Sequence, residues 1–211
     1  MKNRISILAG ALAFGALLFQ PLHAAESAKP ASVVSLMDFR NQLNLLQGDI
    51  AGIVGSLNLV KSCATKQDEL TKAVADLNSR FDRLQNRVET VRSNAVILKA
   101  TVKAHYEAWA KELTSMQSAS LREKAQDRLT RSEKEFEKIS AQAAEAKEEL
   151  LPFVSDIKDC VIYLNADTSD EAVNTLSNTI WKLGNRSRSV SGSITDVIEQ
   201  IDATVKSLPQ R

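Results

Sequence analysis

The chain has 211 residues and a formal net charge of +1, with 25% charged and 5% aromatic residues. This near-neutral balance argues against a nucleic-acid-binding protein and against a strongly basic membrane-surface protein, because both need a clear excess of lysine and arginine. Glycine and proline are also rare, at 7 and 4 residues, which favours a helical protein over a β-sandwich or a β-barrel.

The N-terminus is typical of an export signal. Two basic residues precede an uncharged, mostly apolar stretch over residues 5–19, and small residues follow at Ala24 and Ala25. The apolar stretch is shorter than the roughly 20 residues that a membrane-spanning helix needs. We therefore expect residues 1–24 to be a signal peptide, cleaved after Ala24 or Ala25, and the protein to be periplasmic. An uncleaved membrane anchor is the alternative.

Apolar residues recur at steps of three and four residues through almost all of the remaining chain. Four such series cover residues 36–64, 70–109, 121–164 and 173–201. A mean step of about 3.5 residues is the pattern of helices that pack side by side at a shallow angle. The sequence therefore predicts an all-α fold.

Capping residues indicate where these helices begin. Thr65 and Thr168 each precede an acidic residue by three positions, as in a capping box, and Ser118 stands just before the third series. Pro152 lies inside the third series without changing its phase, which predicts a kink rather than a break. The expected helices cover about residues 34–63, 66–117, 119–164 and 169–207.

Short connections between long helices imply antiparallel neighbours. We expect an up-down-up-down four-helix bundle over residues 34–208, preceded by a flexible segment at residues 25–33. The second and third helices are the longest, at about 65 Å each. Their connection, around residues 110–125, should project beyond the first helix as a two-helix tip.

The first predicted helix differs from the others in composition. Between residues 41 and 60 its only charged residue is Asp49, and Gly48, Gly52 and Gly55 make a small-residue surface. One interpretation is a helix that its neighbours contact on several sides, with glycines permitting close approach. The other is a surface for self-association or membrane contact, although the amide side chains of this helix disfavour a transmembrane span.

Few residues could support catalysis or metal binding. After signal removal His105 is the only histidine, so one chain cannot supply a metal site with two histidines, and no phosphate-binding glycine motif is present. A catalytic pair of Cys63 and His105 would have to reach across some 60 Å of helix. We expect no enzymatic activity, no cofactor or metal, and no nucleic-acid ligand.

Three aromatic residues lie within one helical turn near the expected tip: His105, Tyr106 and Trp109. They are either a recognition surface for a partner or seam residues that pack against the third helix. Trp181 adjoins the seam of the fourth helix, and we expect it in the core or at the core boundary.

The two cysteines are expected to form a disulfide. Cys63 ends the first predicted helix and Cys160 lies in the last turn of the third, so both fall at the same end of the bundle. Two cysteines alone in an exported chain are expected to be oxidised to each other. The bridge requires Cα atoms within about 7 Å of each other.

Three motifs resemble those of a bacterial family of exported helical proteins, domain-of-unknown-function family 2959. They are WAKEL at residues 109–113, SASLREKAQDRL at 118–129 and LLPFVSDIKDCVIYLNA at 150–166. The resemblance covers roughly residues 105–185 and implies a long helical bundle and export. It brings no catalytic residues, because the family has no assigned activity. The first helix and the cysteine pair depart from the family's usual pattern.

These observations favour a non-enzymatic periplasmic bundle that acts through protein–protein contact, as a scaffold, an adaptor or an envelope-associated factor. The sequence does not name its partner, and the first helix is also a candidate for joining copies of the chain into a homo-oligomer. Two alternatives stay open. One is a holding chaperone that clamps clients between helical arms, and the other is a membrane-peripheral protein that lays its first helix on lipid.

Overall fold

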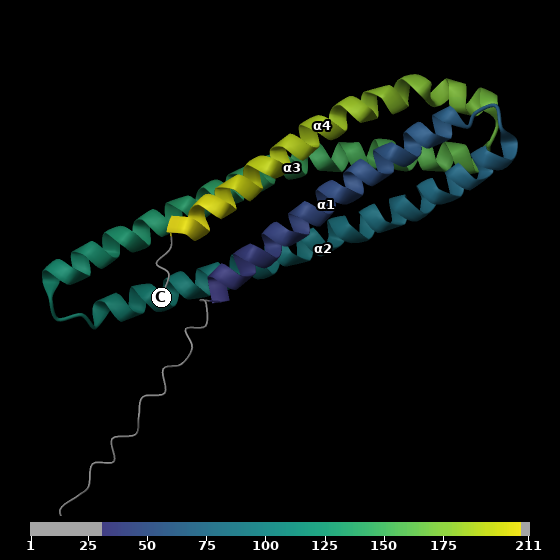
Figure 1. The fold of residues 1–211 in the computed structure, drawn as a ribbon. Coiled ribbons are helices and arrows are strands. Elements are labelled where there is room, and N and C mark those ends of the chain that lie inside the picture. The colour runs from purple at the N-terminus through teal and green to yellow at the C-terminus, as the bar shows by residue number, and fades with distance from the viewer. Residues whose placement is uncertain (1–30, 208–211) are drawn as a thin grey trace, which may run out of the picture.

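The computed structural model describes residues 31–207. The expected signal peptide and the first part of the expected flexible segment lie outside the described residues. Within residues 31–207 the chain forms four helices, whose bounds agree with the sequence-based ones to within three residues. They are α1 (Ala31–Ser62), α2 (Gln67–Thr114), α3 (Ala119–Ala166) and α4 (Asp170–Ser207) (Figure 1).

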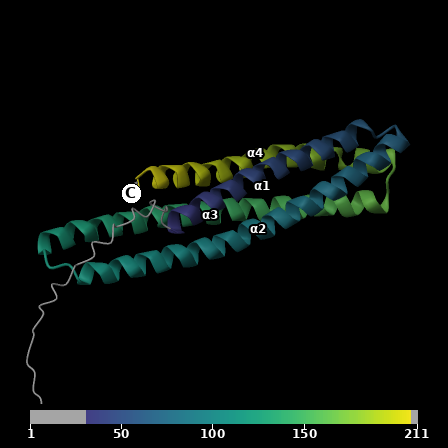
Figure 2. The same ribbon diagram turned by 60° about the horizontal axis from the view of Figure 1, so that its bottom comes forward.

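The four helices form the antiparallel bundle that the sequence predicts. The α1–α2 and α3–α4 connections lie at one end, and the α2–α3 connection lies at the other (Figures 1 and 2). Each helix packs on its neighbour in the chain, and α1 also packs on α4, which closes the ring. The prediction of an all-α, up-down-up-down four-helix bundle is therefore confirmed.

The first turn of α1 corrects one expected boundary. The sequence predicts a flexible segment up to residue 33, but α1 begins at Ala31, and Ser32 and Val33 are buried. Burial of Val33 against the core gives a packing reason for the earlier start.

The projecting tip is also present. The helices α2 and α3 have 48 residues each, whereas α1 has 32 and α4 has 38. At 1.5 Å per residue, α2 and α3 are each about 72 Å long and α1 about 48 Å. Both long helices continue past the start of α1 and the end of α4 (Figures 1 and 2). We call residues 105–131 the tip; its base lies beside the last turns of α4, and the rest extends beyond them as two helices.

The heptad positions form one continuous core. Every helix contributes residues whose side chains are almost fully removed from solvent, and burial of each large aliphatic or aromatic side chain favours folding by about 1.5–3 kcal/mol. Representative members of this core are Leu46, Ile50, Ile53, Leu77, Leu84, Phe153, Ile157, Val190 and Ile201. The apolar inner face of each described helix is therefore buried against the other helices of the bundle.

The helix caps agree with the sequence only in part. Ser118 caps α3 as expected, since its hydroxyl oxygen accepts a hydrogen bond from the backbone of Leu121. The residue before α2 is Lys66, with no side-chain cap, so the expected Thr65 cap is wrong. Ser169, not Thr168, caps α4 by accepting from the backbone of Ala172 at 3.2 Å.

Thr168 has a different role, because its hydroxyl donates to the carbonyl of Leu164 at 2.8 Å and so satisfies the end of α3. Pro152 lies on the exposed side of α3, and the helix runs through it without a break, as predicted. The α3 seam thus keeps one phase along its whole length.

The close contact of α1 with α2 explains Gly52. A Cβ atom at Gly52 would lie 2.9 Å from Nη1 of Arg80, so the glycine leaves room for the guanidinium. Arg80 donates through Nε to Asp76 at 2.9 Å, and Ser56 of α1 donates its hydroxyl to the same carboxylate at 2.5 Å. These donors, the Ser56 hydroxyl first, lower the pKa of Asp76. At Gly52, the prediction that a glycine of the first helix permits a close approach by a neighbouring helix is therefore confirmed.

Candidate functional site

The part of the chain that the structure describes brings together no group of three metal-ligating side chains. Its one histidine, His105, lies far along α2 from Cys63. Because α2 is unbroken, the two residues are separated by on the order of 60 Å. The structure thus agrees with the sequence-based exclusion of a Cys–His catalytic pair.

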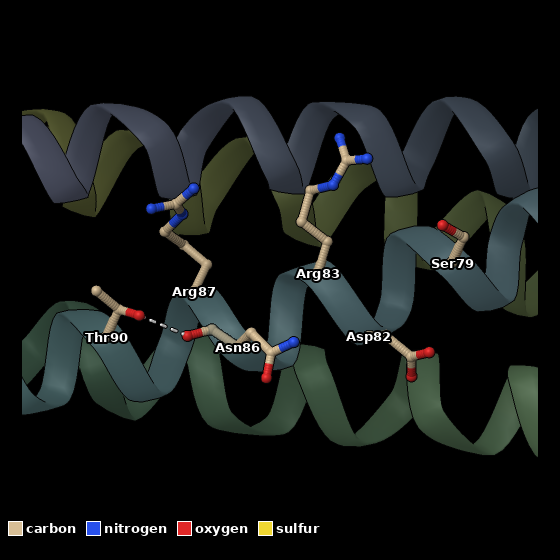
Figure 3. A pocket seen from close by; sticks show the side chains of 6 residues that line it. All are labelled: Ser79, Asp82, Arg83, Asn86, Arg87 and Thr90. Carbon is tan, nitrogen blue, oxygen red and sulfur yellow. Dashed lines mark hydrogen bonds between the residues drawn. The ribbon is translucent and has the colours of Figure 1, made fainter.

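A polar hollow on α2 is large but has no catalytic arrangement. Its volume is about 610 Å³, and its six lining residues all come from α2 (Figure 3): Ser79, Asp82, Arg83, Asn86, Arg87 and Thr90. Arg83 and Arg87 point toward α1, whereas Asp82 points toward α3. Arg87 is already paired with Asp49 of α1 at 3.0 Å and also donates to Gln42 at 2.8 Å. This hollow therefore lies at the edge of the interface between α1 and α2.

The aromatic residues singled out from the sequence form a cluster at the base of the tip. The ring of His105 lies 5.8 Å from that of Tyr106 and 6.0 Å from that of Trp109, measured between centroids, and both pairs are tilted. All three residues are half-buried. The Tyr106 hydroxyl donates to the carbonyl of Ser132 on α3 at 2.8 Å, and burial raises the pKa of Tyr106. The cluster therefore both packs against α3 and leaves part of its surface open.

Two hollows flank this cluster. The first, of about 410 Å³, lies between α2 and α3 and has an apolar floor and a charged rim. Its floor is formed by Val102, Tyr106 and Phe136, and its rim carries Lys99, Lys103, Glu107, Glu133 and Glu137. A groove with an apolar floor and a mixed-charge rim is suited to a protein segment that buries apolar side chains and pairs charges at its edges.

The second hollow, of about 330 Å³, lies where the four-helix body becomes the two-helix tip. It is bounded by Trp109 of α2, by residues of α3 and by the last turns of α4; the other lining residues are Arg128, Arg131, Ser132, Glu135, Ala203, Thr204 and Ser207. Glu135 is engaged by Lys138 at 2.7 Å and by Gln200 at 2.9 Å, and these contacts, Lys138 first, lower its pKa. This hollow was not predictable from the sequence, because it depends on where α4 ends.

Both cysteines are buried, and both thiols are free in the structure. They belong to the same continuous core. The two turns at their end of the bundle are in contact, since Gln67 donates to the carbonyl of Thr168 at 2.8 Å. Burial, with smaller contributions from Asp156 and Asp159, raises the pKa of the Cys160 thiol to about 11. The expected disulfide stays a prediction.

The position of Trp181 differs from the expectation. Its side chain is 64% exposed, while the adjacent Ile180 is buried. A one-residue step turns a helical side chain by about 100°, so a position beside the seam can face solvent. Trp181 lines a hollow of about 610 Å³ between α1 and α4. The expectation that Trp181 lies in the core or at the core boundary is therefore wrong, because its side chain is largely exposed.

The helix α1 is long and apolar enough, by composition alone, to cross a membrane over Ser32–Ser62. The core helix of a folded bundle passes the same test, and the inner side of α1 is buried against α2 and α4. Its composition alone therefore does not distinguish a membrane span from a core helix.

The fold defines a class of elongated, antiparallel four-helix bundles with a two-helix extension at one end. The chain belongs to the family described as "Protein of unknown function (DUF2959)", whose match covers residues 53–208. This match is wider than the region of resemblance from the motifs and leaves out the first part of α1. Neither the curated proteins nor the solved structures include a match to the chain.

Proposed function

We propose that this protein is a non-enzymatic, exported helical bundle that acts through protein–protein contact, as a scaffold, an adaptor or an envelope-associated factor. The observation that carries the proposal is the base of the tip. There, a half-buried aromatic cluster lies between two hollows, at the point where α1 and α4 no longer cover α2 and α3.

The chemistry of this surface suits recognition of a protein. Aromatic and arginine side chains supply a large share of the binding energy at protein interfaces, and Trp109, Arg128 and Arg131 line the same hollow. Tyr106 is held in place by packing against the core and by the hydrogen bond to Ser132, so little of its side-chain entropy is lost on binding. The ring of Trp109 lies near that of His105.

Export and the Cys63–Cys160 disulfide are parts of the same proposal. The basic and apolar character of residues 1–24 supports export, and an oxidising compartment favours a bridge between two cysteines. The contact between the two turns at their end of the bundle supports the pairing. In the periplasm the bridge would hold the α1–α2 turn against the C-terminal part of α3.

The structure favours this reading over the holding chaperone. A chaperone of the clamping kind needs apolar inner faces that clients can reach, and the apolar inner faces of the described helices are buried in one core. A membrane-peripheral role has one supporting observation, the exposed apolar residues Val34, Leu45 and Leu59 on α1.

Cross-linking in the native envelope, followed by identification of the cross-linked proteins, tests the proposal. The wild-type chain should give a discrete heterologous product, and Trp109→Ala should weaken it strongly without loss of helical content. Trp181→Phe, a conservative change of the other tryptophan, is the control and should leave the product unchanged. A product equally strong in Trp109→Ala would contradict a binding role for the tip base.

A further inference from the structure

A second surface, away from the tip, lies along α1 and the adjoining side of α4. Its most prominent residue is Trp181, with 64% of its surface exposed. Single exposed apolar residues are common on protein surfaces, but tryptophan is one of the three residues that are enriched among the hot spots of protein interfaces. Here it stands beside a hollow and not on a flat, charged helix face.

The hollow lies between α1 and α4 and has a volume of about 610 Å³. Small and apolar residues line most of it; from α1 these are Ile50, Ala51 and Val54, and from α4 they are Ile180, Gly184, Ser187 and Ser191. The amides of Asn58 and Asn185 and the exposed guanidinium of Arg188 complete the lining beside Trp181. On the exposed side of α1, nothing lies within 4 Å of a Cβ atom placed at Gly48 or Gly55. The surface therefore carries a large projecting side chain and a depression side by side.

The α1 part of this surface carries little charge. Between residues 41 and 60 the only charged residue of α1 is Asp49, which is turned to the other side, where Arg87 of α2 binds it. Nearer the start of α1, Asp38 is exposed. The exposed side of α1 instead carries amides and apolar residues, with Leu45 49% and Leu59 47% exposed. Along residues 41–60 of α1, two copies can therefore approach each other without repulsion between like charges, and Arg188 of α4 is the charge that the dimer accommodates at the hollow.

The exposed amide side chains of α1 indicate whether this surface binds lipid or protein. Asn41, Asn44 and Asn58 are exposed on α1, and burial of an amide without a hydrogen-bond partner in hydrocarbon is unfavourable by several kcal/mol. An amide can, however, pair with an amide, because it both donates and accepts. Asn78 and Asn165 form such a reciprocal pair within this molecule, at 2.8 and 2.9 Å.

We propose that the α1–α4 face binds a second copy of this chain, in a twofold-symmetric dimer. In a twofold interface each copy presents the same patch, so a surface with both a projection and a depression can be complementary to itself. Trp181 of each copy enters the depression of the other, and the α1 amides pair across the interface. This inference is independent of the tip, which stays free in such a dimer.

The size of the face fits a stable interface. From Val34 to Leu59 the exposed side of α1 is about 38 Å long. Two adjacent helices, each roughly 10 Å across, make the face about 20 Å wide. The product is on the order of 800 Å² per copy, close to the area that each partner buries in an interface of standard size.

The experiment is sedimentation analysis of the purified chain without its signal peptide, over a concentration series. The wild-type chain should show a monomer–dimer equilibrium, and Trp181→Ala should raise the dissociation constant by about 30-fold or more, the effect of losing an interface hot spot. Ala51→Glu, which places a charge in the depression, should abolish the dimer. Ala144→Glu is the matched control, because Ala144 is an exposed alanine on α3, and it should leave the dimer intact.

Circular dichroism shows whether each variant remains folded, and a Trp109→Phe background leaves Trp181 as the only tryptophan. In that background the emission of Trp181 should shift to shorter wavelength as the dimer forms. A wild-type chain that is monomeric at high concentration would overturn the proposal, as would a dimer that persists in Ala51→Glu. Flotation of a monomeric protein with vesicles of anionic and zwitterionic phospholipid would overturn it in favour of lipid.

Discussion

At the scale of single residues, Asp76 connects α2 to α1. Its carboxylate accepts from Ser56 across the interface and from Arg80 within α2. A carboxyl group whose pKa is lower in the folded state stabilises the fold above its unfolded pKa, near 4, and this contribution is lost as the pH falls through the folded value. The Asp76 contacts therefore favour the folded state at neutral pH and weaken in acid.

Asp76→Asn should lower the free energy of unfolding at pH 7 by less than about 1 kcal/mol, because the carboxylate is partly exposed and screened by solvent. The loss of stability between pH 5 and pH 3 should be smaller in Asp76→Asn than in the wild type. Urea unfolding at a series of pH values measures both. Asp82→Asn is the control, since Asp82 points away from α1 (Figure 3); equal acid sensitivity of Asp76→Asn and the wild type would contradict the assignment.

The cysteines give a second prediction at this scale. Protein isolated from the periplasm should contain no free thiol and be about 2 Da lighter than its reduced form. Closing the loop from Cys63 to Cys160 should stabilise the fold by up to about 4–5 kcal/mol, so reduction should lower the midpoint of thermal unfolding. Free thiols in periplasmic protein under non-reducing conditions would show that the pair is not bridged.

The raised pKa of Cys160 provides a control for that measurement. The thiolate is the reactive form of cysteine, and burial raises the pKa of Cys160 to about 11. In the reduced, folded protein Cys160 should therefore react slowly with iodoacetamide at pH 8, and unfolding should remove this protection. Slow labelling alone is thus no proof of a disulfide, and the intact mass is needed.

At the scale of helices, the sequence predicted the number and the lengths of the helices better than the contacts of individual side chains. The 3.5-residue repeat is set by core packing, and the buried residues Leu46, Leu77, Phe153 and Ile201 all belong to the predicted series. The expected Thr65 cap of α2 was wrong because α2 begins at Gln67, one residue later than predicted, which leaves Lys66 at the N-cap position with no side-chain hydrogen bond. The burial of Trp181 was predicted wrongly because two adjacent positions of a helix face different directions. Which of them is buried depends on where the neighbouring helix lies.

The site was predictable only in part. The aromatic cluster of the tip was visible as three residues within one turn, because turn spacing alone brings such residues together. The hollows beside the cluster were not, since one needs the end of α4 beside Trp109 and the other needs the register of α2 on α3. Likewise, the sequence shows Gly52 as one of several small residues of α1, and it does not reveal that Arg80 fills the space next to Gly52.

Pro152 provides a prediction for the stability of α3. Proline has no backbone N–H to donate to the preceding turn and its ring crowds that turn, so it weakens a helix interior. Pro152→Ala should raise the free energy of unfolding by about 1–2 kcal/mol, the helix gain less the greater freedom of the unfolded chain. Chemical denaturation measures the change, and Ser155→Ala, at another exposed position of α3, is the control. A destabilised Pro152→Ala would mean that the proline contributes a favourable bend.

At the scale of the whole molecule, the two proposed contact surfaces are separate. The α1–α4 face lies along the four-helix body, and the aromatic cluster lies at the base of the tip, near the end of α4. A dimer formed through the body would present two tips, and two linked binding sites raise the overall affinity for a partner with repeated epitopes. Variants of Trp181 and of Trp109 therefore separate self-association from binding of another protein.

The central claim is that the base of the tip binds another protein in the envelope. The most direct test places a photo-reactive amino acid at Ala110, an exposed residue that lines a tip hollow, and at Ala144 on the α3 body as a control. On irradiation of intact cells, position 110 should give a discrete adduct with a different protein, which Trp109→Ala weakens, and position 144 should not. Adducts of equal strength at both positions, or none at position 110, would contradict the claim.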